Sequence, residues 1–125
     1  MAAICIEVEG IRLEAELNQS GTAKNILQRL PLEGRANTWG DEIYFDIPLQ
    51  LELETDARTE VAIGDLGYWP VGSAFCIFFG PTPVSTDDTP RAYSPVNVFG
   101  RITGDASLLK SVRDGAGIRV TDGSL

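Results

Sequence analysis

Apolar and polar residues alternate with a period of two along much of the chain, a pattern typical of β-strands with one buried face. The alternation is regular in 11–17, where apolar side chains take every second position and charged side chains stand between them. An apolar, β-branched run at 3–8 comes just before it, across the turn residues Glu9 and Gly10. These two segments therefore predict a β-hairpin. Further strands are expected at 35–39, 42–47, 73–79, 95–102 and 117–121.

Two short segments predict helices. Ser20 is a typical N-cap residue, and apolar residues spaced three and four apart follow it as far as Leu30, just before Pro31. Asp105 begins a second segment with apolar residues on one face, which is expected to end at Val112. Both helices are short, and the segments that predict strands are more numerous. The domain is therefore expected to be mainly β.

The run 73–79 predicts a central strand, because apolar side chains occupy both of its faces and both must be covered. Turn residues bound this run within 64–83. Residues 55–70 are expected to form a connection, and 80–95 a long surface loop of the kind that often carries function. The stretch 49–53 alternates like a strand, but it also fits a loose helix or a loop edge.

About eight short strands, their hairpin turns and two helices predict one domain over residues 1–125. Antiparallel strands with frequent Gly and Pro between them favour a closed barrel or a sandwich. In a barrel, the helices at 20–30 and 105–112 would cap the two ends.

Composition and charge narrow the classes of function. The chain is 43% hydrophobic and 22% charged, as ordinary globular domains are, and no apolar stretch is long enough to cross a bilayer. No signal-peptide pattern follows Met1, which predicts a cytoplasmic product. The net charge of −8 would repel phosphate groups, so we expect neither nucleic acid nor a membrane as a partner.

Few residues suggest catalytic or metal chemistry. The surplus of acidic residues is expected to form a solvated face of strands and loops, although a site for a hard cation stays an alternative there. It consists mainly of Asp41, Glu42, Asp46, Glu52, Glu54, Asp56 and Glu60. The absence of histidine removes Ser-His-Asp and Cys-His catalysis and the commonest zinc ligands. Cys5 and Cys76 lie in apolar runs and are expected to be buried, reduced thiols. We expect no metal site and no cofactor.

Several strings resemble those of cyclophilins, and they occur in the same order. The string at 21–30 resembles the family's first helix, which reads Thr-Ala-Glu-Asn-Phe. Gly-Ser-Ala-Phe-Cys-Ile at 72–77 resembles the family's Gly-Ser-Gln-Phe-Phe-Ile strand, and Val-Phe-Gly-Arg-Ile at 98–102 its Val-Phe-Gly-Lys-Val strand. The run at 64–83 is more similar still to small prokaryotic cyclophilin-like proteins of unknown function. The resemblance implies a closed, roughly eight-stranded antiparallel barrel with two short capping helices.

Cyclophilins are peptidyl-prolyl isomerases, but this chain does not match the residues that the resemblance assigns to catalysis. Asp46 stands at or near the position of the family's arginine, which reverses the charge. Cys76 stands where the family's strand has its second aromatic residue, and Val96 falls near the family's histidine. The family's glutamine and tryptophan have no counterpart. The resemblance thus implies the fold, and we identify no catalytic residue.

The favoured function is that of a non-catalytic module that binds a small molecule or a peptide in a groove on the barrel face. Aromatic side chains favour pockets and interfaces, and an arginine can hold an anionic or carbonyl group. The candidate ligand-binding residues are Tyr44, Trp69, Cys76, Phe78, Arg91 and Tyr93. Two alternatives stay open: a weak prolyl isomerase, and a structural protein that forms homo-oligomers through an apolar face.

Overall fold

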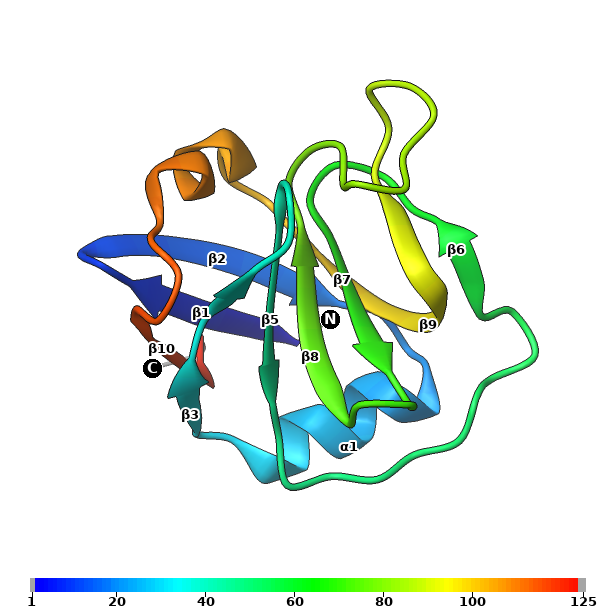
Figure 1. The fold of residues 1–125 in the computed structure, drawn as a ribbon. Helices are drawn as coiled ribbons and strands as arrows, with labels where there is room; N and C mark the ends of the chain where they lie inside the picture. The colour runs from blue at the N-terminus through cyan, green and yellow to red at the C-terminus, as the bar shows by residue number, and fades with distance from the viewer. Residues whose placement is uncertain (1, 124–125) are drawn as a thin grey trace.

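The computed structural model describes residues 2–123, which contain ten β-strands, one α-helix and one 3-10 helix (Figure 1). The strands are β1 (Ala3–Val8), β2 (Ile11–Leu17), β3 (Leu32–Arg35), β4 (Asn37–Thr38), β5 (Glu42–Asp46), β6 (Arg58–Glu60), β7 (Asp65–Trp69), β8 (Ala74–Phe78), β9 (Arg91–Ile102) and β10 (Gly117–Asp122). The helices are α1 (Gly21–Arg29) and the 3-10 helix η1 (Ala106–Ser111). Residue 1 and residues 124–125 of the predicted domain lie outside the described residues.

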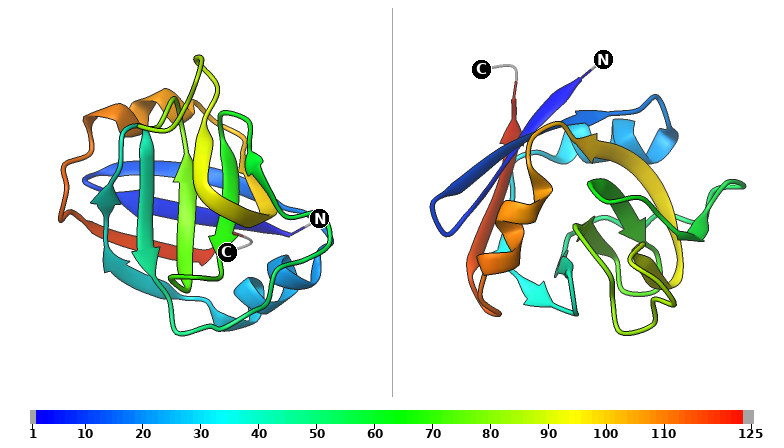
Figure 2. Two further views of the ribbon diagram at one scale, coloured as in Figure 1. Left: turned by 45° about the vertical axis from the view of Figure 1, so that its right-hand side comes forward. Right: turned by 90° about the horizontal axis from the view of Figure 1, so that it is seen from above.

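The ten strands pair in an antiparallel manner throughout, which confirms the mainly β, antiparallel prediction. They follow the order β3-β10-β1-β2-β9-β7-β8-β5-β4, and β6 pairs with β9. This path curls round the core (Figure 2), yet among the described residues no ladder joins its two ends. The predicted closure into a barrel is therefore not confirmed. The reason is covalent: only Ala36 separates β3 from β4, so these strands run end to end and cannot lie side by side.

The predicted hairpin of β1 and β2 is confirmed. The two strands pair in register from Ala3↔Glu16 to Val8↔Ile11. The turn between them consists of Glu9 and Gly10, whose φ angles are 49° and 79°. Two successive residues with positive φ give a hairpin turn whose twist matches that of the strands, which explains the Gly at its second position.

Both predicted helices are present, and they lie at opposite ends of the curled sheet (Figure 1). The hydroxyl of Ser20 accepts a hydrogen bond from the backbone N–H of Ala23 (3.1 Å), so this residue caps α1 as expected. The carboxylate of Asp105 accepts one from the N–H of Ser107 (3.0 Å), but the segment that it begins is 3-10 and not α. Apolar side chains of both helices pack into the main core.

The main core fills the inside of the curled sheet. The ring of Phe75 packs between those of Phe45 and Phe99, with centroids 5.2 Å and 5.1 Å away. Each such fully buried ring contributes roughly 1.5–3 kcal/mol through removal of its apolar surface from water. The inward faces of β1, β2 and β8 add aliphatic side chains to the same cluster. The stability of the fold therefore resides mainly on this side of the sheet.

A second, smaller apolar cluster covers the outer face of the sheet. Alternate residues of β8 point to opposite sides, so Phe75 and Ile77 enter the main core while Cys76 and Phe78 enter the second cluster. Val61, just after β6, and Ala92 and Val96 from the first half of β9 belong to this cluster. The prediction that the central strand is covered on both faces is confirmed, and the second cluster borders the candidate site.

Two parts of the chain differ from the sequence-based expectation, and the structure decides a third that the sequence left open. The predicted connection 55–70 contains β6 and β7, and the predicted loop 80–95 ends early because β9 begins at Arg91. The stretch 49–53 is irregular, and the Tyr68 hydroxyl holds it by donating to the carbonyl of Leu49 (2.7 Å). The strands β6 and β7 are not predicted from the sequence pattern, because β6 is short and β7 is covered on both faces. Cover on both faces removes the alternation of apolar and polar residues.

Candidate functional site

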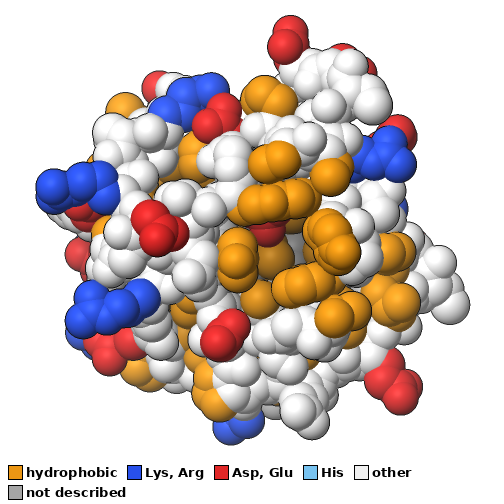
Figure 3. Space-filling model, viewed as in Figure 1, with side chains coloured by type: hydrophobic (Ala, Val, Ile, Leu, Met, Phe, Trp, Pro, Cys, Tyr) orange, Lys and Arg blue, Asp and Glu red, His pale blue; other side chains and the backbone are white. Residues whose placement is uncertain are grey.

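A pocket of about 220 Å³ opens on the outer face of β5, β7 and β8. Figure 3 shows apolar side chains gathered around a hollow on this face of the molecule. The lining consists of Trp39, Glu42, Tyr44, Trp69, Cys76, Ala92, Tyr93, Ser94 and Val96. Four of these nine side chains are aromatic, and one is an acidic residue.

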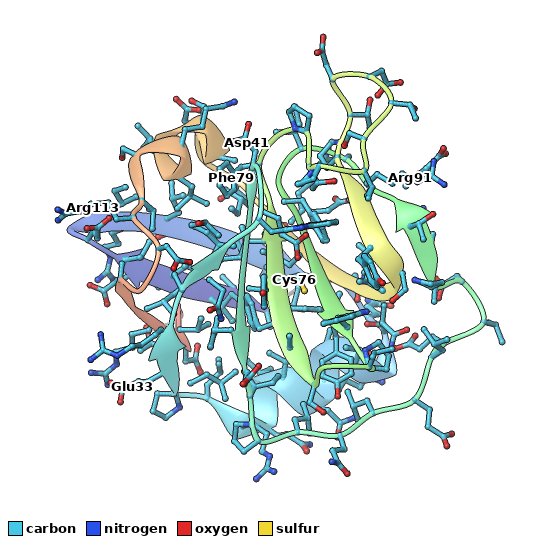
Figure 4. The ribbon with its side chains drawn as sticks, viewed as in Figure 1. Glu33, Asp41, Cys76, Phe79, Arg91 and Arg113 are labelled. Carbon is cyan, nitrogen blue, oxygen red and sulfur yellow. The ribbon has the colours of Figure 1, made fainter. Side chains whose placement is uncertain are left out.

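Strand register explains how distant residues come to share this face. Directly opposed residues of an antiparallel pair point to the same side of the sheet. Tyr44 of β5 lies opposite Cys76 of β8, and Trp69 of β7 lies opposite Ala74, two residues along β8. Trp69 and Tyr44 are therefore held on either side of Cys76, and Figure 4 shows Cys76 in the middle of the sheet face.

The turn between β4 and β5 brings Trp39 and Glu42 together. The backbone N–H of Trp39 donates to the carbonyl of Glu42 (2.9 Å), and the N–H of Glu42 donates to the carbonyl of Trp39 (3.2 Å). These reciprocal bonds make the two residues a directly opposed pair across the two-residue turn of Gly40 and Asp41. Their side chains consequently project to the same side, into the pocket.

Three aromatic rings form one wall of the pocket. The ring centroid of Tyr93 lies 6.1 Å from that of Trp39 and 6.2 Å from that of Trp69, with interplanar angles of 77° and 84°. Edge-to-face contacts of this kind are favourable and fix the relative orientation of the rings. The indole N–H of Trp69 also donates to the hydroxyl of Ser94 (2.5 Å), which holds the ring against β9. The wall thus joins residues from β7, β9 and the β4–β5 turn.

The carboxyl group of Glu42 lies at the floor of the pocket. Glu42 is only 6% exposed, and among residues 2–123 no Lys or Arg forms an ion pair with it. Burial raises the pKa of Glu42 to about 7, although a hydrogen bond with the Cys76 side chain acts in the opposite direction. Burial, together with the nearby Glu42 carboxylate, raises the pKa of the Cys76 thiol well above its ordinary value. Near neutral pH, Glu42 is therefore poised between its charged and neutral forms, while Cys76 stays a thiol.

The structure brings together four of the six predicted ligand-binding residues: Tyr44, Trp69, Cys76 and Tyr93 line the pocket. Phe78 is fully buried in the second cluster and is not part of the lining. The guanidinium of Arg91 lies 3.9 Å from the carboxylate of Glu60, outside this pocket and at the margin of the face (Figure 4). Ligand binding by these residues stays a prediction.

The expectation that Glu42 lies on a solvated acidic face is wrong, since this residue is buried. Asp46, four residues after Glu42 on the same face of β5, is exposed as expected and does not line the pocket. Sequence reasoning also missed Trp39 as a lining residue. The predicted turn at Gly40 and Asp41 could have indicated both the place of Trp39 and that of Glu42. It pairs Trp39 with Glu42, on the strand face that also carries Tyr44.

The alternative of a hard-cation site finds no ligand set. Among residues 2–123, no group of three or more His, Cys, Asp or Glu side chains is placed to hold a metal ion. No helix in this part of the chain combines the length and apolarity that a bilayer span requires.

Comparisons with known proteins cover nearly the whole chain. A family model described as Cyclophilin-like matches residues 2–121. The solution structure of the hypothetical protein AF2241 from Archaeoglobus fulgidus is similar, with a TM-score of 0.82 and 38% sequence identity, over 98% of this chain and 95% of that chain. No curated protein matches the chain. These matches confirm the resemblance that the strings at 21–30, 64–83 and 98–102 indicated.

Proposed function

The chain belongs to the cyclophilin-like family, and we propose that it is a non-catalytic binding protein that takes a small molecule or a peptide side chain into the pocket of the outer sheet face. The observation that carries this proposal is the lining itself. Ligand pockets are mostly apolar and aromatic, with a few polar groups that fix the orientation of the ligand. Here four aromatic rings surround the Glu42 carboxyl and the Ser94 hydroxyl.

The volume supports a small occupant. Pockets for drug-sized ligands measure roughly 300–1,000 Å³, and this one measures about 220 Å³. It suits a compact metabolite or a single side chain of a peptide. The rings are also held in place before binding, through the contacts of Tyr93 with both tryptophans and of Trp69 with Ser94. A wall that is already ordered loses little conformational entropy when a ligand binds.

Prolyl isomerisation is a weaker candidate. Its transition state contains a twisted peptide bond whose nitrogen has lost resonance, so a donor such as an arginine stabilises it. Of the described residues, neither Asp46 at the family's arginine position nor Arg91 belongs to the lining. The acidic net charge of −8 also makes nucleic acid an unfavourable partner. A cytoplasmic location and self-association both stay predictions.

The two tryptophans of the chain provide a direct test, because both of them line the pocket. We expect a fragment set of amines, carboxylic acids, indoles and prolyl dipeptides to include compounds that change tryptophan fluorescence. The same compounds should shift the indole N–H signals of Trp39 and Trp69 in a ¹⁵N–¹H spectrum. The Trp39→Phe and Trp69→Phe variants assign each signal.

Tyr44→Ala should weaken the binding of any such compound at least tenfold, through lost contact area and lost ring stacking. Leu108→Ala is the matched control, since Leu108 is 49% exposed on η1 and lies outside the lining. The proposal fails if no compound acts on the tryptophans, or if the shifts scatter over the surface and survive Tyr44→Ala. Protein that accelerates prolyl isomerisation in a peptide assay would also overturn it.

A further inference from the structure

We infer that the pocket selects an organic cation, an alkylammonium group whose charge meets the Glu42 carboxylate and whose carbon atoms contact the aromatic wall. This inference rests on the proposed function, and it names the class of ligand. The group can belong to a free small molecule or to a lysine side chain of a peptide. Two independent features of the lining support it: an acidic side chain without a cationic partner, and several rings whose faces attract cations.

The first feature is the acidic floor. A buried carboxylate normally has an ion-pair partner, because a charge removed from water must be compensated. Each of the five ion pairs in the described chain uses another acidic residue, namely Glu7, Glu9, Glu33, Asp41 or Glu60. Glu42 is 6% exposed, and no Lys or Arg among residues 2–123 forms an ion pair with it. A cation that enters the pocket would supply the compensation that the protein itself lacks.

The second feature is the ring wall. An ammonium group is attracted to the face of Trp or Tyr when it lies within about 6 Å of the ring centroid, and the effect grows as water is excluded. Tyr93 stands at steep angles to Trp39 and Trp69 with centroids 6.1 Å and 6.2 Å apart, so the rings surround the mouth from different directions. Tyr44 adds a fourth ring next to Cys76. Steeply inclined rings suit a round, charged head group better than a flat one.

The surrounding charges do not compete with such a ligand. Arg91, which precedes the lining residue Ala92, pairs with Glu60, and Arg58, which lies opposite the lining residue Val96, is not itself part of the lining. Besides Glu42, the pocket is lined by Cys76 from β8, Tyr44 from β5, Ala92, Tyr93, Ser94 and Val96 from β9, Trp69 from β7 and Trp39 after β4. None of these carries a positive charge. The net charge of −8 further raises the local concentration of cations.

The main competing interpretation is a neutral ligand. In its protonated form, Glu42 would donate a hydrogen bond to a carbonyl group, and the rings would contact an uncharged body. The two interpretations predict opposite pH dependence. Because burial raises the pKa of Glu42 to about 7, a cation should lose affinity about tenfold for each pH unit below 7, whereas a carbonyl ligand should lose affinity above 7.

Choline and 3,3-dimethylbutan-1-ol provide the decisive pair of probes, because they share one shape and differ in charge. Calorimetric titration of the folded chain between pH 5.5 and pH 8.5 would measure both affinities. At pH 8 we expect choline to bind at least tenfold more tightly than the alcohol, with the difference largely lost at pH 5.5. Choline carries its charge at every pH, so any dependence belongs to the protein.

Butylammonium and Nα-acetyl-lysine N-methylamide distinguish the two sources of the alkylammonium group. Tighter binding of the lysine derivative assigns the pocket to a peptide, and tighter binding of choline or butylammonium assigns it to a free amine. Either result supports the inference that the pocket selects an alkylammonium group. The isosteric Glu42→Gln variant should lower cation affinity by about 10- to 100-fold and remove its pH dependence. Glu14→Gln, at an exposed position of β2, is the matched control.

Equal affinity for choline and the alcohol, or affinity that rises on acidification, would overturn the inference while leaving the proposed pocket intact. If uncharged or acidic fragments bind but none of the cations does, the inference of a cationic ligand fails and the proposed pocket stands. If no compound of any class binds, the proposed function fails as well. A collapsed ¹⁵N–¹H spectrum would show that Glu42→Gln does not fold. In that case the pH dependence of binding to the wild-type chain still distinguishes a cationic from a neutral ligand.

Discussion

The side chains of Cys76 and Glu42 come together in the lining of one pocket, although 34 positions separate them in the chain. The antiparallel pairing of β5 with β8 produces this contact, since it places Tyr44 opposite Cys76 and Glu42 two residues along. An acid and a thiol, both desolvated, are thereby coupled. Their properties yield the first two predictions.

Glu42 should make the chain less stable as the pH rises. Its pKa is raised from 4.5 to about 7 in the folded state, so between these values the folded chain binds a proton that the unfolded chain has released. The unfolding free energy contributed by this group therefore falls from pH 4.5 to pH 7 and levels off above it. The total loss is on the order of 3 kcal/mol.

Urea unfolding of the wild type and Glu42→Gln at pH 5, 6, 7 and 8 would measure this effect. The amide cannot ionise, so the variant should gain relative stability with rising pH and exceed the wild type at pH 8. Glu14→Gln should follow the wild type at every pH. Parallel curves for wild type and Glu42→Gln would contradict the raised pKa.

Neither thiol should react in the native chain. Cys5 and Cys76 are each 1% exposed, and burial raises the pKa of both, so little thiolate forms at pH 8. Ellman's reagent should label no thiol in native protein during the time in which it labels both in urea. The Cys5→Ala variant isolates Cys76. Rapid native labelling of that variant would show that the pocket floor is accessible, contrary to the burial.

Asn97 should be a large contributor to stability. Its side chain is 1% exposed and donates to the hydroxyl of Thr22 (3.1 Å) and the carbonyl of Glu52 (2.9 Å), while its oxygen accepts from the N–H of Glu54 (2.8 Å). Asn97→Ala removes the partner of the Glu52 carbonyl and of the Glu54 N–H, so the unfolding free energy should fall by about 2–4 kcal/mol. Hydrogen exchange at Glu54 should accelerate, because its N–H loses the Asn97 side chain as acceptor.

Asn37→Ala is the control for Asn97→Ala. Asn37 is exposed, and its side chain donates one hydrogen bond, to the carbonyl of Tyr44 (3.2 Å). Its loss should lower the unfolding free energy by less than about 1 kcal/mol. Equal effects of the two substitutions, measured by urea unfolding, would show that the buried network does not hold the segment.

Gly72 should control the position of the Trp69 ring without lining the pocket. A Cβ atom at Gly72 would lie 2.6 Å from Cζ3 of Trp69, closer than carbon atoms approach, so the ring must move. Gly72→Ala should therefore disturb the bond from Trp69 to Ser94 and change tryptophan fluorescence. Gly117→Ala, where a Cβ meets no atom within 4 Å, should leave the spectrum unchanged. An unchanged spectrum in both variants would contradict this packing.

Much of the fold could be predicted from local sequence patterns. The hairpin at Glu9 and Gly10 and the cap at Ser20 each depend on a few adjacent residues, so the sequence alone predicts them. The strands β6 and β7 escaped because Arg58–Glu60 is short and Asp65–Trp69 is covered almost entirely. Closure into a barrel is not confirmed, and local patterns cannot settle it, because they count strands but do not say which ones are neighbours.

Only part of the candidate site could be predicted from the sequence. Tyr44, Trp69, Cys76 and Tyr93 could be chosen from residue type and resemblance, and they do line one pocket. Arg91 and Phe78 could not be excluded in advance, because strand register and the ion pair with Glu60 decide where they point.

Adjacent residues and composition are enough to predict the family, the antiparallel β class, the caps and turns, and the absence of histidine chemistry. The tertiary structure alone decided that Glu42 is a buried acid and not part of a solvated surface. That outcome depends on the register of β5 against β8 and on the cover from β9, which bring segments from four parts of the chain around one carboxyl group. Desolvation is a property of that assembly, and no local pattern contains it.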